Sequence, residues 1–462
     1  MTSDSAAGHW RRRCLVASAA IVGVLLLGLC LEAASLVYVY VKTGKVFYFN
    51  RPEASSLREN SGWATGRLSA DVVERLHPYF GYVALPRPDF RPGFSYNNFG
   101  FISPYDYPYE KTDPKDLVIG VFGGSVASGY SIYEIQNGVL ADRLARDESL
   151  AERRPVFLSL AAGGYKQPQQ LVILNYLLSI GQHFDLVINI DGFNEVALSP
   201  LNVKRGIDPT MPSVQHVTPL TSLGHNRLSR EWLTELLRTL EFKDRMRFGR
   251  DAMRNSDLAT VYVFHDVMMQ RASARLSDTI RDLDRLDAPG GVTPGSSVYY
   301  YYASAADPDE SNVARRVSEH WEQSSRLMNE TLSALGIPYL HVLQPNQYFK
   351  TGRHFSDNEK RTALDPDSPY RPGVLAGYPQ LIARVAGLAA DGVRIADGTA
   401  VFDDLDESAY VDSCCHYTRP GEQRFSEFVS EEVVAVLRSH GDVRTIASIS
   451  TSRQPADGEP VR

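Results

Sequence analysis

The stretch LVIGVFGGSVASG, residues 117–129, decides the fold. It begins as a short apolar run and ends in glycines and a serine, which is typical of a buried parallel strand followed by a tight turn. Ser125 in that turn has three possible roles: part of a phosphate cradle, a nucleophile, or a plain turn residue. A P-loop needs a lysine before the serine, and a dinucleotide site needs the spacing G-x-G-x-x-G. The stretch has neither, so the nucleophile and the plain turn remain.

Further apolar runs of strand length follow along the chain and alternate with helical patterns. The alternation predicts βαβ units, and therefore a parallel sheet sandwiched between helices. The expected strands after the first are residues 155–161, 184–191, 338–345 and 392–397. The expected helices are residues 133–147, 167–181, 378–390 and 421–439.

The composition of the 462 residues is that of a globular protein, with 43% hydrophobic and 22% charged residues. The net charge of −7 and the lack of a basic run argue against binding to nucleic acid. Cys414 and Cys415 are adjacent and the other two cysteines lie near the N-terminus, so we expect no disulfide framework and favour two thiols over a vicinal disulfide. No cluster has convincing metal-site spacing, so we expect neither a metal nor another cofactor.

The N-terminal region contains an apolar span. Residues 15–31 carry no charge, and the apolar stretch continues past Glu32 to residue 41, which exceeds the roughly 20 residues that cross a bilayer. A cleaved signal peptide has a shorter core and a small-residue cleavage site, for which residues 33–35 are a poor match. We therefore favour an uncleaved anchor over a cleaved signal. Three arginines at 11–13 on a short tail favour an N-terminus inside and a main domain outside the cytoplasm, in the periplasm or at the cell surface.

These patterns predict five regions. They are a cytoplasmic tail at 1–14, a transmembrane anchor at 15–41, an irregular segment of loops and short strands at 43–115, an α/β domain at 116–445 with a helical insertion at about 200–335, and a disordered tail at 446–462.

Polar and glycine motifs follow the expected strands. Besides Ser125 they are Gly163-Gly164, GFNE at 192–195 and DSCCH at 412–416. In an open parallel sheet the carboxyl ends of the strands meet at one crevice, so we expect these motifs to come together.

The chemistry of these residue types suits acyl transfer. A serine hydroxyl needs an adjacent base, which His416 would provide, with Asp412 holding the imidazole. The developing oxyanion needs fixed donors, for which we expect the backbone N–H groups of Ser125 and Gly164 and the side chain of Asn194.

The motifs together resemble those of the SGNH, or GDSL-type, hydrolases. Residues 123–125 match the Gly-Asp-Ser block with a glycine in place of the aspartate. Gly164 best matches the second-block glycine, with the preceding glycine as the alternative, and residues 192–194 match Gly-x-Asn. Asp412 and His416 match the last block, with one residue more between them than in Asp-x-x-His.

The resemblance implies a three-layer α/β/α fold with a flavodoxin-like parallel sheet. It also implies a serine esterase that cleaves O-acetyl or similar esters on an envelope carbohydrate or lipid through an acyl-Ser125 intermediate. HPYFGYV (77–83), YNNFGF (96–101) and LQPNQYF (343–349) are similar to a membrane-anchored bacterial branch of this superfamily. The sequence does not indicate an oligomeric state.

Three alternatives remain beside the esterase. A polysaccharide O-acyltransferase would use the same residues. A non-catalytic binding module on the same scaffold would explain the two departures from the family motifs. An α/β-hydrolase is disfavoured, because residues 123–127 lack the last glycine of G-x-S-x-G and the serine follows the first strong strand.

Other residues have more than one interpretation. The position of His341 on a strand favours a place in the core. Glu195 is more consistent with a cap of the following segment than with a residue that tunes the site. QPNQY at 344–348 fits a substrate contact or a turn equally. Tyrosines 299–302 fit a packing patch or, less well, a platform for sugar rings. The alternative triad acids, in what we interpret as a solvated acidic loop, are Asp403, Asp404 and Asp406.

Overall fold

The computed structural model describes residues 4–49, 74–91, 93–221, 230–254, 256–287 and 310–451. Two compact units divide the chain. We call Met1–Ala70 with Ser229–Asp287 the helical unit, and Asp71–Leu228 with Ala288–Arg462 the α/β unit. Tyrosines 299–302 lie outside the described residues.

Five parallel strands form the central sheet of the α/β unit. Their spatial order is β10-β9-β8-β6-β7, and every neighbouring pair is parallel. Counted along the chain, this is the order 2-1-3-4-5 of flavodoxin-like sheets. The strands are β6 (Asp116–Gly123), β7 (Arg154–Ala161), β8 (Leu186–Asp191), β9 (Tyr339–Leu343) and β10 (Arg394–Asp397). The predicted α/β fold with a parallel sheet is therefore confirmed.

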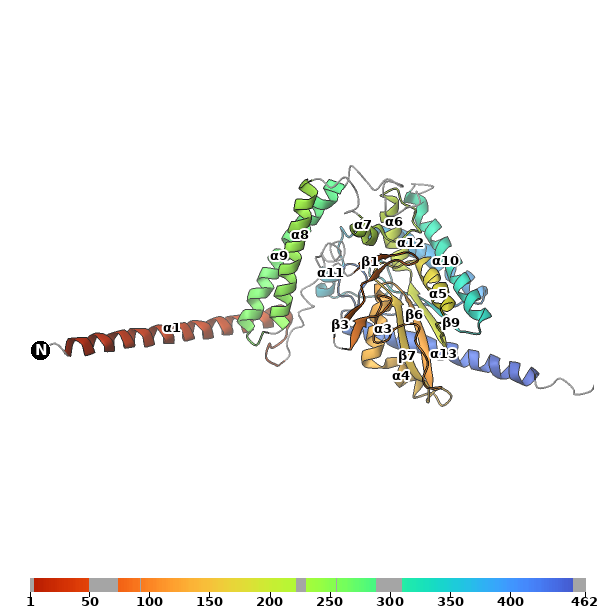
Figure 1. The fold of residues 1–462 in the computed structure, drawn as a ribbon, viewed down its shortest axis with the longest axis horizontal. Helices are drawn as coiled ribbons and strands as arrows, with labels where there is room; N and C mark the ends of the chain where they lie inside the picture. The colour runs from red at the N-terminus through yellow and green to blue at the C-terminus, as the bar shows by residue number, and fades with distance from the viewer. Residues whose placement is uncertain are drawn as a thin grey trace, which may run out of the picture. The chain divides into compact units, whose positions relative to one another are not determined.

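The sheet lies between two helical layers, so its central strands are apolar on both faces (Figure 1). Every residue of β6 and of β8 is buried. One layer contains α3 (Ser125–Asn137), α4 (Val139–Leu144) and α13 (Arg419–Thr451). The other contains α5 (Gln169–Ser179), α6 (Phe193–Val203), α10 (Glu310–Ala334) and α12 (Arg371–Ala390).

Three helix boundaries differ from the sequence-based expectation. The helix expected from residue 133 begins at Ser125, and Gly138, with φ of 68°, separates it from α4. The small residues after Gly124 have the composition of a turn, but packing against β6 and β7 makes them helical. α12 begins at Arg371 rather than near 378. α13 continues to Thr451, so residues 446–451 of the predicted disordered tail are helical; the rest of that tail lies outside the described residues.

Short antiparallel strands precede the central sheet in the segment 43–115. HPYFGYV forms the hairpin of β1 (Glu74–His77) and β2 (Gly81–Ala84). A second small sheet contains β3 (Arg87–Arg91), β4 (Phe94–Tyr96) and β5 (Ile102–Ser103). Among the described residues, the α/β unit also contains two short helices, α7 (Val214–Thr221) and α11 (Asp357–Ala363).

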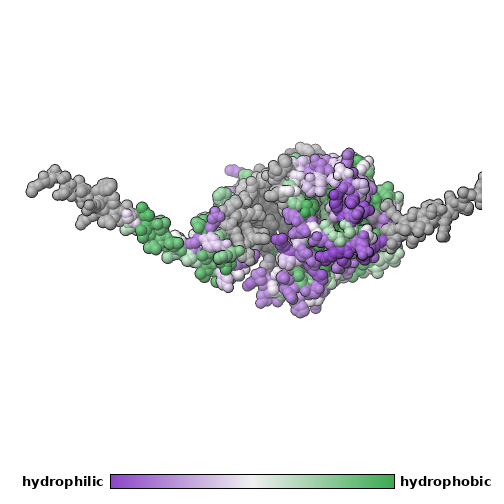
Figure 2. Space-filling model, turned by 90° about the horizontal axis from the view of Figure 1, so that it is seen from below, coloured by the Kyte–Doolittle hydropathy of each residue, from purple (hydrophilic) through white to green (hydrophobic). Residues whose placement is uncertain are grey.

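The helical unit contains α1 (Asp4–Thr43), α8 (Arg230–Arg254) and α9 (Ala259–Asp287). Within α1, Ser18–Thr43 has a mean hydropathy of 2.4 and is long and apolar enough to cross a membrane. Figure 2 shows the described part of this helix as largely apolar surface. Leu25, Leu27 and Leu29 are each more than half exposed. An apolar helix of this kind suits a signal anchor or a signal peptide.

The C-terminal part of α1 packs against α9. Glu32 accepts hydrogen bonds from the backbone N–H groups of Ala259 (2.6 Å) and Thr260 (2.9 Å), which lie at the start of α9. In the last turn of α1, Lys42 pairs with Asp266 at 2.5 Å. The range predicted as a helical insertion, 200–335, thus includes α8 and α9 of the helical unit and α10 of the α/β unit.

Candidate active site

The candidate site lies where the strand order of the sheet reverses. β6 is the first strand of the sheet along the chain, and its neighbours β7 and β8 continue the chain on opposite sides. Ser125 begins α3 directly after β6, and Asn194 lies in the first turn of α6 directly after β8. Such a switch point leaves a crevice outside the carboxyl ends of the strands, where ligands of these folds bind.

Ser125, His416 and Asp412 form one hydrogen-bonded chain. His416 Nε2 lies 2.8 Å from Ser125 Oγ, and His416 Nδ1 lies 2.6 Å from Asp412 Oδ2. With the imidazole proton on Nδ1, facing Asp412, Nε2 accepts the hydrogen bond of the serine hydroxyl. The structure thus brings together the three residues that the sequence analysis selected as nucleophile, base and acid.

The residues 412–416, here called the His416 loop, accommodate the additional residue by folding around the Asp412 side chain. Asp412 Oδ1 accepts hydrogen bonds from the N–H groups of Cys414 (3.0 Å), Cys415 (3.1 Å) and His416 (3.2 Å). The N–H of Val411 donates to the His416 carbonyl at 2.9 Å and closes the loop. One carboxylate oxygen thus holds the loop backbone, and the other faces the imidazole.

The stretch QPNQY at 344–348 supports the His416 loop. Asn346 and Gln347 are buried, and their side-chain amides donate hydrogen bonds to carbonyls of the loop at 3.0 and 2.9 Å. The Tyr348 hydroxyl donates to a third loop carbonyl at 2.9 Å. The three acceptors are the backbone carbonyls of residues 412–414. Of the two interpretations from sequence, these contacts favour a structural role over a substrate contact.

The environment of His416 makes it a stronger base. Burial lowers the pKa of His416, but the negative charges of Asp412 and Cys415 outweigh this effect and raise the pKa well above its usual value. The imidazolium that forms when the serine loses its proton is therefore stabilised.

Asn194 explains the glycine before the serine. Its Nδ2 donates to the Tyr165 carbonyl at 2.7 Å and occupies the space beside Gly124, where a Cβ would lie 2.1 Å from it. An aspartate at 124 has no room in this arrangement. The Asn194 amide therefore lies beside Gly124, the residue before Ser125. The N–H of Ser125 is in the first turn of α3, where helix N–H groups have no intrahelical acceptor.

Gly164 lies in the loop after β7. Residues on both sides of it are hydrogen-bonded to the motifs that contain Ser125 and Asn194. The N–H of Ala162 donates to the Gly123 carbonyl at 3.4 Å, and the Tyr165 carbonyl accepts from Asn194. Gly164 has a φ of 75°, and a Cβ on it would lie 2.1 Å from His216 Nε2. Only glycine fits this backbone and this close approach.

The N-terminal hairpin supports the same loop. The Tyr82 ring stacks on the His216 ring with centroids 4.4 Å apart, and the Tyr82 hydroxyl donates to the Gly163 carbonyl at 2.8 Å. His216 Nδ1 lies 2.9 Å from a carboxylate oxygen of Glu74. The segment before the α/β domain therefore helps to form the site.

Glu195 acts as a helix cap, as the sequence analysis favoured. It accepts hydrogen bonds from the N–H groups of Gly192 and Gln167, both at 2.8 Å, and so joins the loops after β7 and β8. Burial and the nearby charge of Asp191 raise the pKa of Glu195 to about 8.

A second polar chain, which the sequence analysis missed, lies in the core behind these loops. Asp191 Oδ1 lies 2.8 Å from His341 Nε2 and accepts from Trp321 Nε1 at 2.6 Å, while His341 Nδ1 lies 2.7 Å from the Ser325 hydroxyl. All four residues are buried, so this Ser-His-Asp chain is closed to substrate. It confirms His341 as a core residue and fixes the end of β8 next to Gly192. The sequence signal was two polar residues, Asn189 and Asp191, in a strand that is otherwise apolar.

The alternative acids of the loop 403–406 lie elsewhere. Asp403 accepts from the N–H of Gly352 at 2.8 Å, and Asp404 pairs with Arg424 at 2.9 Å. Asp406 is exposed. In this structure, Asp412 is the residue whose carboxylate is hydrogen-bonded to His416.

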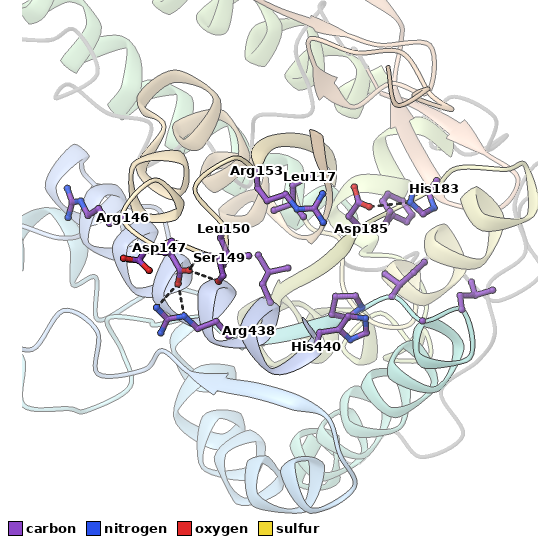
Figure 3. A pocket seen from close by; sticks show the side chains of 17 residues that line it. Leu117, Arg146, Asp147, Ser149, Leu150, Arg153, His183, Asp185, Arg438 and His440 are labelled. Atoms are coloured by element: carbon purple, nitrogen blue, oxygen red, sulfur yellow. Dashed lines mark hydrogen bonds and ion pairs between the residues drawn. The ribbon is translucent and has the colours of Figure 1, made fainter. Parts of the chain in front are cut away.

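A cavity of about 890 Å³ lies at the other end of the sheet. Its walls include Leu117 and Asp185, near the amino ends of β6 and β8, together with Asp147 and Arg438 (Figure 3). Asp147 pairs with Arg438 and accepts from Ser149 there. Ser125 follows the carboxyl end of β6, so this cavity is separate from the candidate site.

No protein-family model matches the sequence, and no curated protein shows significant similarity to it.

The position of Asn194 gives a testable prediction at Gly124. If Asn194 is an oxyanion donor, as expected from the sequence, Gly124→Asp should lower kcat for ester hydrolysis about 10²-fold or more, because the new side chain displaces the Asn194 amide. Initial rates with p-nitrophenyl acetate measure the effect.

The matched control is Gly129→Ala, in α3, the helix that Gly124 precedes. A Cβ there meets its nearest atom, a carboxylate oxygen of Glu422, at 3.8 Å, so the rate is expected to be unchanged. An active Gly124→Asp variant would show that the Asn194 amide does not have to stay at this position.

Proposed function

We propose that the chain is a serine esterase of the SGNH type that cleaves acyl esters through an acyl-Ser125 intermediate. The observation that carries this proposal is the continuous chain from Ser125 Oγ through both nitrogens of His416 to Asp412, at 2.8 and 2.6 Å. A carboxylate, an imidazole and a hydroxyl in this order are the parts of a nucleophilic serine site.

The reaction has two half-steps. His416 Nε2 takes the hydroxyl proton while Ser125 Oγ attacks the ester carbonyl, and the negative charge moves to the carbonyl oxygen. Donors at Ser125 N–H, Asn194 Nδ2 and the Gly164 N–H stabilise that oxyanion. His416 then gives its proton to the departing alcohol, which leaves an acyl-Ser125 ester. In the second half-step His416 takes a proton from water, the hydroxide attacks the acyl carbon, and the serine recovers its proton.

The proposed location follows from α1 and the arginines before it. We propose that α1 stays in the membrane as an anchor, with residues 11–13 in the cytoplasm and the α/β unit outside it. An enzyme fixed there meets the esters of envelope carbohydrates and lipids, which we propose as the substrate class.

The test is turnover by the full chain in detergent, first with p-nitrophenyl acetate and then with an added sugar acceptor. The proposal expects release of p-nitrophenol above the rate in buffer and formation of free acetate. Acetyl sugar formed at the expense of acetate would identify an O-acyltransferase that uses the same acyl-Ser125. A folded protein that turns over neither this ester nor acetylated sugars would contradict the proposal and favour the binding module.

A further inference from the structure

Two thiols lie beside the candidate base and take no part in the proposed reaction. Cys414 and Cys415 are 5% and 1% exposed and are not joined in a disulfide. Their Sγ atoms lie 3.4 Å apart, and Cys415 Sγ lies 3.9 Å from His416 Nε2. The two sulfurs and this nitrogen are all within 4.8 Å of one another.

These distances are close to those of one face of a tetrahedral zinc site. With Zn–S bonds of about 2.3 Å and Zn–N bonds of about 2.0 Å, two sulfurs are about 3.8 Å apart and a sulfur and a nitrogen about 3.5 Å apart. The observed 3.4 and 3.9 Å differ from these values by a few tenths of an ångström. The remaining pair, Cys414 and His416, lies within 4.8 Å, so side-chain rotation, chiefly of Cys414, would bring all three ligand atoms to one ion.

The surroundings of His416 also fit a ligand imidazole. Histidines that bind zinc through one nitrogen usually donate from the other to a carboxylate, which fixes the ring. Asp412 Oδ2 is in this place, 2.6 Å from Nδ1, and Asp412 Oδ1 holds the backbone of both cysteines. The His416 side chain is 19% exposed, so an ion can reach its ring from solvent.

We propose that Cys414, Cys415 and His416 bind a thiophilic divalent cation, with zinc as the type case, and that the bound ion switches off the Ser125 site. Binding forms two Zn–S bonds and one Zn–N bond, and any protons that the two sulfurs and His416 Nε2 carry beforehand go to solvent. Water or the Ser125 hydroxyl takes the fourth position. His416 Nε2 cannot hold the ion and accept the serine proton together, so metal binding and ester hydrolysis exclude each other. The inhibition of Ser125 rests on the proposed function, whereas the metal site itself does not. A metal site here differs from the sequence-based expectation of no metal.

The binding test uses the full chain in detergent, reduced with a phosphine and freed of metal by a chelator. Zinc is titrated against a chromophoric chelator, and Co²⁺ is added separately, because cobalt–thiolate bonds have a characteristic near-ultraviolet charge-transfer band. We expect one zinc per chain and a cobalt–thiolate band. Cys414→Ser and Cys415→Ser should each weaken zinc binding at least about 100-fold, more than loss of an outer-shell partner does.

Cys30→Ser is the matched control, because Cys30 is an exposed thiol of α1 that lies far from the His416 loop in sequence. It should bind zinc as the wild type does. Unchanged zinc affinity in both loop variants, or no zinc bound by the reduced wild type, would overturn the site.

Activity separates this proposal from the proposed function. If both hold, zinc abolishes hydrolysis and prevents labelling of Ser125 by an organophosphonate, and the chelator restores both. Zinc bound by a chain that is inactive when metal-free would keep the site and contradict the esterase. Hydrolysis that continues with the site filled would overturn the inhibitory role. An active enzyme that binds no zinc would overturn the metal site and leave the esterase standing.

Discussion

Ser125→Ala is expected to abolish ester hydrolysis, with kcat for p-nitrophenyl acetate lower by about 10⁴-fold or more. The variant removes the attacking oxygen but keeps a good helix former at the first position of α3, so the fold should remain. His416 and the proposed oxyanion donors stay in place, so the variant should keep a small residual rate. The measurement is the initial rate of the full chain in detergent, with circular dichroism as the check on folding.

Ser131→Ala is the matched control for this variant. Ser131 is a buried serine of the same helix, and its hydroxyl donates to the Ala127 carbonyl at 3.0 Å rather than to His416. The control should lose little activity. Equal rates for Ser125→Ala and the wild type would mean that the serine is only the turn residue after β6, or part of a binding site.

Asp412→Asn has the second large expected effect, a loss of about 10⁴-fold in kcat. The asparagine oxygen can still accept the three backbone N–H groups of the His416 loop, so the loop should keep its shape. The new amide donates to His416 Nδ1, which moves the imidazole proton to Nε2. In that tautomer Nε2 has no lone pair to accept the proton of Ser125.

Kinetics and the midpoint of thermal unfolding together test the Asp412 prediction. We expect a large fall in kcat with a small change in the midpoint. The comparison variant is Asp406→Asn, an exposed aspartate that the sequence offered as an alternative acid, and it should be fully active. A fully active Asp412→Asn variant would contradict the assignment of Asp412 as the acid that orients His416.

The sheet and the residues of the triad could be predicted from local patterns. Each central strand is mostly apolar, because helices cover both faces, and each is followed by glycine or polar residues. Since parallel strands end at the same edge, motifs 291 residues apart, such as Ser125 and His416, were expected to meet.

The parts that sequence patterns missed depend on contacts between distant segments. The glycine at 124 is explained by Asn194, which follows another strand. The five-residue loop from Asp412 is held by buried amides of Asn346 and Gln347, which in sequence have the composition of a turn. The start of α3 at Ser125 depends on packing that outweighs the weak helix propensity of its first residues.

The most direct measurement of the central claim is mass spectrometry of the metal-free, full-length protein after reaction with an organophosphonate. Such a reagent forms a stable ester with a serine that is activated by a neighbouring imidazole. The account predicts one phosphonyl group per chain, located on the peptide that contains Ser125, and no labelling of Ser125→Ala or of His416→Ala. A folded wild-type protein that stays unlabelled, or that is labelled at another residue, would contradict it.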